Sequence, residues 1–180
     1  MPVISPHRQA GLAALCGLYI VLYHLSGALA DNHEIGFAVS IFFLPAFVRV
    51  LGYLLFGFWS VPALFVAALA CIDLGLAWSD QLLMAGCLAI GGPLGAHVAG
   101  RLSGLERSLD NLSPLRLLLV SLGCAAGNAL FYTAALAVTG HPGSGMEQVG
   151  FILIGDTLGT WTIIYLLKGS LTIWGRLRQS

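Results

Sequence analysis

Ionisable side chains within apolar stretches are the residues of this sequence that could do chemistry. Arg49, Asp73 and Asp156 each lie in a long apolar run. A charged side chain inside a bilayer is costly unless it is paired or hydrated, so such residues line a ligand site, line a conduction path or pair with one another. These three residues, with Asn128 and His24 as weaker polar candidates, are the predicted polar core.

Asp156 is the strongest single candidate, and Arg49 is the residue that could pair with it. Pro45 precedes Arg49 by about one helical turn and predicts a kink, because proline removes a backbone donor. Counted along the expected helices, Arg49 and Asp156 differ in depth by about 10 Å, which only a long side chain or a shifted register would bridge. The alternatives left open are a pair with Asp156, a pair with Asp73, and an Arg49 side chain that reaches the inner interface.

Pairs of glycines four residues apart recur in the second half of the chain. Such spacing lets another backbone approach a helix closely. The pairs are Gly91 and Gly95, Gly123 and Gly127, and Gly155 and Gly159. They predict a tight contact among three helices, which could also serve as an interface with a partner.

Helices that cross a membrane are the elements expected to position these residues. Hydrophobic residues make up 58% of the 180 and charged residues only 9%, against roughly 25% charged in soluble domains. The apolar runs have the length of about 20 residues that a bilayer requires. The expected fold is therefore a single all-α domain, residues 1–180, forming a polytopic transmembrane helical bundle with six spans. The spans are 10–30, 35–56, 60–78, 81–100, 115–139 and 149–167.

The distribution of basic residues predicts the orientation of this bundle, because Lys and Arg accumulate on the cytoplasmic side of membrane proteins. Seven of the eight basic residues fall on one side of the six-span arrangement: Arg8, Arg101, Arg107, Arg116, Lys168, Arg176 and Arg178. The opposite loops carry the acidic residues Asp31, Glu34, Asp80 and Glu147. The N and C termini are both predicted to be cytoplasmic. The first span is longer than a secretory signal core and is expected to be retained.

Several classes of function are disfavoured by the sequence. No nucleophile beside a base, HExxH motif or recognisable carboxylate pair is present, so no catalytic residue is predicted and an enzyme is the minority interpretation. The four cysteines show no metal-ligand spacing, so neither a metal nor another cofactor is expected. A formal net charge of zero without a basic cluster argues against nucleic acid as a partner.

Three short segments occur in a recognisable order. The first is a proline-bearing run at 43–46 followed by a glycine-aromatic-proline connection at 55–59 and Pro62, and the second is the apolar stretch 113–140. The third is Ile154-Gly155-Asp156-Thr157-Leu158-Gly159 in the last span. This order resembles the MASE type of membrane-associated sensor domain, a bacterial integral membrane domain. Members of that family have more spans and continue into kinase or cyclase domains, and Arg49 lies where the family would have an apolar residue. The resemblance implies signal perception or partner docking, with Asp156 at the matched position.

Two functions are expected from these observations. The first is a sensor-like or docking module of the bacterial inner membrane that binds a small ligand or another membrane protein between its helices. Its expected partners are the lipid bilayer and another membrane or signalling protein, or further copies in a homo-oligomer. The alternative is a small transporter or substrate-binding membrane subunit. In that case, a helix broken at Pro45 and a buried Arg49 would hold an anionic solute near the middle of the bilayer.

Overall fold

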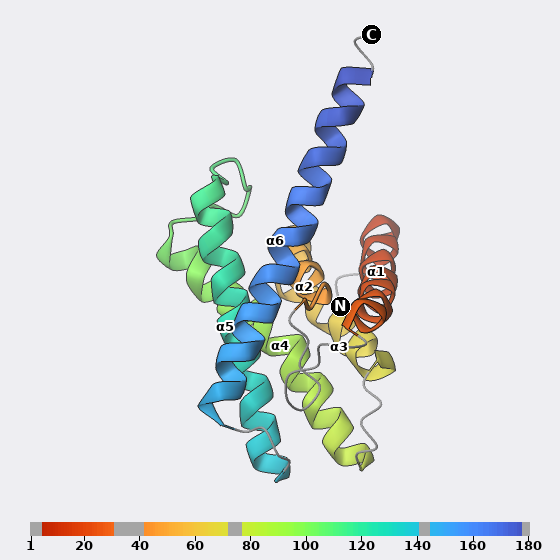
Figure 1. Ribbon diagram of the computed structural model, residues 1–180, viewed down its shortest axis with the longest axis vertical. Coiled ribbons are helices and arrows are strands. Elements are labelled where there is room, and N and C mark those ends of the chain that lie inside the picture. Colours follow the sequence, from red (N-terminus) through yellow and green to blue (C-terminus); the bar gives the residue numbers. More distant parts are fainter. Residues whose placement is uncertain (1–4, 31–41, 72–76, 141–144, 178–180) are drawn as a thin grey trace.

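The computed structural model describes residues 5–30, 42–71, 77–140 and 145–177, and every regular element in these ranges is a helix. The elements, shown in Figure 1, are α1 (Pro6–Ala30), α2 (Pro45–Phe56), the short 3-10 helix η1 (Gly57–Trp59), α3 (Ser60–Cys71), α4 (Trp78–Leu102), α5 (Pro114–Thr139) and α6 (Met146–Leu177). The predicted all-helical fold class is confirmed.

Within the described residues, five helical runs, not six, are long and apolar enough to cross a membrane, so the predicted number of spans is wrong. The runs are Pro6–Leu29, Pro45–Cys71, Trp78–Leu102, Pro114–Thr139 and Met146–Thr172. The second and third predicted spans become α2 and α3, which have 12 residues each. A 12-residue helix is about 18 Å long and cannot by itself cross a hydrocarbon core of about 30 Å. The five runs are compatible with a multi-pass membrane protein.

The run from α2 to α3 is bent at η1. Gly57 ends α2 with a φ of +59°, a backbone conformation that glycine adopts without strain. A Cβ on Gly52 would lie 3.2 Å from the Cβ of Ser60, although residues eight apart in a straight helix are separated by about 12 Å along the axis. The chain therefore turns back at η1 and packs the end of α2 against the start of α3.

The start of α2 lies against the middle of α6. The backbone N–H of Phe43 donates to the carbonyl oxygen of Gly155 at 3.2 Å, and the N–H of Leu44 donates to Ser26 Oγ of α1 at 2.9 Å. Pro45 is the first residue of α2, where a missing N–H costs nothing. The predicted kink is therefore a helix start, and the preceding backbone donors find partners inside the protein, as a low-dielectric environment requires.

Glycine pairs join α4 and α5 backbone to backbone. A Cβ on Gly91 would lie 2.8 Å from the carbonyl oxygen of Gly127, and a Cβ on Gly123 would lie 2.7 Å from that of Gly95. Any larger residue would force the helices apart. Two of the three predicted glycine spacings thus face each other, as Figure 1 shows for the adjacent α4 and α5.

The third glycine spacing has a different partner from the one expected. A Cβ on Gly159 would collide with the carbonyl group of Phe43, at 2.5 Å from its carbon. Gly155 and Gly159 therefore accommodate the non-helical segment before α2, and they do not complete a three-helix glycine contact.

Candidate functional site

A buried ion pair between Arg49 of α2 and Asp156 of α6 forms the centre of the polar core. Arg49 Nη1 donates to Asp156 Oδ2 at 3.1 Å, and the two residues are 1% and 3% exposed. Within the described part of the chain, no other ion pair is found. Burial makes each charge dependent on the other, because an unpaired ion in such surroundings is strongly destabilising.

Two further helices contribute hydrogen bonds to this pair. Arg49 Nη2 donates to the hydroxyl oxygen of Tyr19 from α1 at 3.0 Å, and Asn128 Nδ2 of α5 donates to Asp156 Oδ2 at 2.7 Å. Tyr19 and Asn128 are also buried. The polar cluster, defined as Tyr19, Arg49, Asn128 and Asp156, therefore ties together α1, α2, α5 and α6.

The guanidinium group also lies against aromatic rings. The Arg49 Cζ is 5.0 Å from the centre of the Phe43 ring and 5.6 Å from that of Tyr19, within the range of cation–π attraction. Gly92 of α4 leaves room for the aliphatic part of Arg49, since a Cβ there would lie 3.1 Å from Arg49 Cδ. The charge is thus enclosed by a carboxylate, a hydroxyl group and two ring faces.

The early start of α2 explains how Arg49 reaches Asp156. Because α2 begins at Pro45 beside Gly155 and Gly159, Arg49 lies about one turn into the helix at the level of Asp156. The depth difference expected from the sequence disappears with this change of register. Asp156 is consequently the partner of Arg49, whereas Asp73 lies outside the described residues.

Two buried side-chain oxygen atoms of α5 are not hydrogen bonded. Asn128 Oδ1 and Thr133 Oγ1 have no hydrogen-bond partner among the described residues. A buried acceptor without a donor costs about 1–3 kcal/mol, so Asn128 Oδ1 favours the approach of a water molecule or another small donor. It is the position at which the polar cluster could accept one further hydrogen bond.

His24 does not belong to the polar cluster. Its side chain is exposed on α1, with its ring 5.8 Å from that of the adjacent Tyr23. The other histidine of a predicted span, His97 of α4, is half-buried, and its Nδ1 lies 3.0 Å from Tyr53 Oη near one end of the bundle. The described residues contain no group of three or more His, Cys, Asp or Glu side chains placed to hold a metal ion.

Sequence reasoning missed Tyr19 and Ser26, both on α1. They share a buried face with Leu15 and Leu22, and the steps of four, three and four residues are those of one helix face. That spacing could have identified a stripe in which a phenol and a hydroxyl point into the bundle. A stripe of this kind requires polar partners on other helices.

The arrangement stabilises a fold more readily than it carries out a reaction. Arginine keeps its proton at all ordinary pH values, and the carboxylate of Asp156 is already engaged by two donors. The ion pair makes the polar cluster electrically neutral, and only Asn128 Oδ1 within it has no hydrogen-bond partner among the described residues. Its chemistry is that of an anchor that fixes α2 against α6.

Comparisons with known proteins add no relative. No protein-family model, no curated protein and no solved structure matches the chain. The resemblance to the MASE type of sensor domain therefore remains a prediction.

Proposed function

We propose that this chain is a membrane-embedded docking module that presents the C-terminal part of α6 to a helix of another protein. In this proposal the polar cluster holds the bundle in shape. The contact with the partner is made where α6 leaves the bundle.

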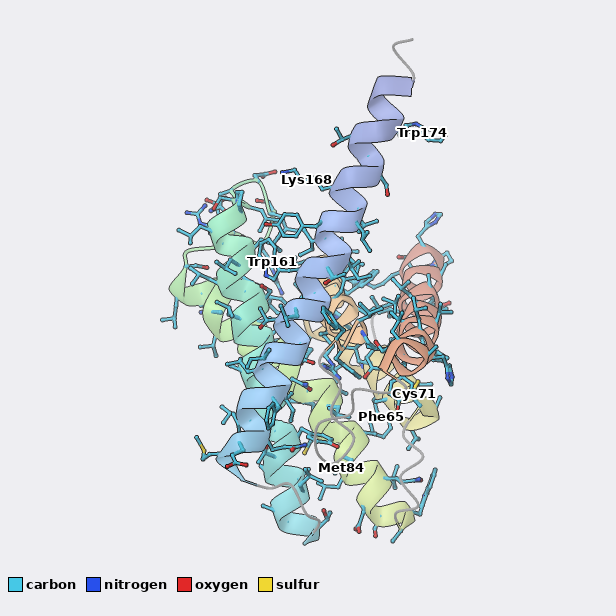
Figure 2. All side chains as sticks on the ribbon, viewed as in Figure 1. Phe65, Cys71, Met84, Trp161, Lys168 and Trp174 are labelled. Atoms are coloured by element: carbon cyan, nitrogen blue, oxygen red, sulfur yellow. The ribbon has the colours of Figure 1, made fainter. Side chains whose placement is uncertain are left out.

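The length and register of α6 support this proposal. With 32 residues, α6 is about 48 Å long, well beyond the thickness of a hydrocarbon core. Trp161 Nε1 donates to Ser121 Oγ of α5 at 3.2 Å, which places the start of α5 at about the level of Lys168. Figures 1 and 2 show the turns of α6 after Lys168, with Trp174 on them, extending past the other helices.

Exposed apolar side chains on this extension are the observation that carries the proposal. Leu171 is 72% and Trp174 63% exposed. Together with Ile164 and Leu167 they follow the alternation of three and four residues that is typical of a seam between packed helices. In this proposal Leu171 and Trp174 lie beyond the lipid, where exposed apolar residues require another cover. A helix of a partner would supply it.

The transport alternative receives less support. An anionic solute would have to displace Asp156 from Arg49, whose side chain is almost fully enclosed. The ion pair satisfies the charge that the solute was expected to meet. The buried arginine is therefore better explained as part of the anchor.

The orientation and location of the module are part of the proposal. Arg8 lies over the Trp59 ring at 5.6 Å, and Arg116 Nε donates to the carbonyl oxygen of Ser103 at 3.1 Å. These contacts help to group basic residues at the end of the bundle from which α6 extends. We propose that this end and both termini face the cytoplasm of a bacterial cell. The termini share a side in this proposal because the run Pro45–Cys71 turns back at η1 and the other four runs each cross once. As the resemblance to the MASE type implies, the module would perceive a signal.

Site-specific photo-crosslinking in native membranes tests the docking proposal. A photoreactive residue in place of Leu171 should give one discrete protein adduct, because this position faces the partner. The matched control is Val138, which is 77% exposed near the opposite end of α5 and should give no such adduct. The mass of the adduct distinguishes a second copy of this chain from a different protein.

Adducts to lipid alone from position 171 would contradict docking at α6. The same protein adduct from positions 171 and 138 would also contradict it, since random collision in the membrane explains that pattern.

A further inference from the structure

Exposed aromatic side chains gather at the bend between α2 and α3. Phe58 and Trp59 of η1 are exposed, as is Leu55 in the last turn of α2. Tryptophan, like tyrosine, is enriched where a bilayer meets water. The bend therefore has the composition of a surface at the level of lipid headgroups.

Tyr53 and His97 join this aromatic surface to α4. The Tyr53 hydroxyl lies 3.0 Å from His97 Nδ1, and the Phe58 ring is 5.2 Å from the His97 ring. Arg101 follows His97 by one turn of α4 and is exposed. Arg107 follows two residues after Leu105, which packs, like Tyr53, against the buried cluster that includes Ala96 of α4. Aromatic and cationic groups thus occupy one side of the same bundle end.

The charges of Arg101 and Arg107 are not neutralised by neighbouring carboxylates. Within the described ranges, neither Arg101 nor Arg107 has a carboxylate oxygen within 4.0 Å. The loop between α4 and α5 also contains Glu106 and Asp110, but Arg8, Arg101, Arg107 and Arg116 outnumber these two acidic residues. A net positive field remains at this end, beside exposed apolar side chains.

We propose that Tyr53, Phe58, His97, Arg101 and Arg107 form a binding site for the headgroup of an anionic phospholipid. The phosphate group would lie at Arg101, Arg107 and His97, and an acyl chain would run along Leu55 and Phe58. A phospholipid carries an anion and an apolar chain in one molecule, which matches the adjacent cationic and apolar surfaces better than a soluble anion does. This site is separate from the α6 extension and does not depend on the proposed docking.

Native mass spectrometry of the full chain with added lipids tests this site. Phosphatidylglycerol should remain bound to the unaltered protein more strongly than phosphatidylcholine, and should raise the unfolding temperature more. Each of Arg101→Gln and Arg107→Gln should weaken phosphatidylglycerol binding about fivefold, since a basic residue near an anionic surface contributes about that factor. The combined variant should lose the preference for phosphatidylglycerol.

Lys168→Gln is the matched control, because Lys168 is an exposed cation on α6 near the same bundle end. It should leave the lipid preference unchanged. Unchanged unfolding temperatures without lipid would show that the arginine variants fold, as expected for exposed side chains.

Three outcomes would overturn the proposal. One is equal retention of phosphatidylcholine and phosphatidylglycerol by the unaltered protein. Another is a Lys168→Gln effect as large as that of the double arginine variant. The last is an equal thermal shift with inorganic phosphate, which would indicate an anion site that does not require lipid.

Discussion

The contact between α4 and α5 and the contact between α2 and α6 are stabilised in different ways. Two continuous helices meet through Gly91, Gly95, Gly123 and Gly127, and the only backbone donor missing inside α4 is that of Pro93. In contrast, α2 begins within the bundle and requires an ion pair and donated backbone hydrogen bonds to stay there. Close approach suffices for regular helices, whereas an interrupted helix needs specific polar partners.

The largest expected effect comes from substituting a glycine of the regular contact. Gly95→Leu should prevent folding, because even a Cβ would overlap the backbone of Gly123 and no rotamer relieves that collision. The measurement is the fraction of monodisperse protein after purification in mild detergent. Gly86→Leu is the control on the same helix, since a Cβ there meets nothing within 4 Å. Normal recovery of the Gly95 variant would show that α4 and α5 do not pack this closely.

Breaking the ion pair should have the next largest effect. Arg49→Leu or Asp156→Asn should each lower the free energy of unfolding by about 3–5 kcal/mol, because the remaining partner is left buried and uncompensated. Unfolding in mixed detergent micelles measures the change.

A double variant distinguishes the pair from two independent contributions. Arg49→Leu combined with Asp156→Asn removes both charges and should lose much less stability than the sum of the single losses. Simple addition of the two losses would mean that Arg49 and Asp156 do not act as a pair.

A smaller effect is expected at the glycine that accommodates the segment before α2. Gly159→Ala should lower the free energy of unfolding by about 1–3 kcal/mol, because its methyl group would push against Phe43. Gly169→Ala in the extended part of α6 meets nothing within 4 Å and should not destabilise the protein. The same unfolding measurement compares the two variants, and equal stabilities would contradict the observed contact.

The same contrast explains how much of the fold was predictable. The expected spans 81–100 and 115–139 lie within α4 and α5, because apolar length and turn residues define regular helices. The expected span 35–56 was extended too far toward the N-terminus, since α2 begins at Pro45. Hydropathy cannot separate a helix from an apolar segment whose donors are satisfied by Ser26 and Gly155.

The candidate site was predictable by residue type but not by geometry. Arg49 and Asp156 stood out because charge is rare in apolar runs. Their pairing depended on where α2 begins, which is set by contacts with distant parts of the chain. Tyr19 went unnoticed because a phenol in an apolar run resembles an ordinary core residue until its hydroxyl has a partner.

The position of Asp156 late in the sequence has a consequence for biosynthesis. Arg49 and its counter-ion are separated by 107 residues, so at about 5–20 residues per second the ribosome needs on the order of 5–20 s to make the second after the first. During that interval α2 has neither its carboxylate nor the α6 surface on which it begins. The nascent protein must therefore keep an uncompensated arginine near the translocation machinery or the membrane surface, and the final helix completes the assembly of the earlier ones.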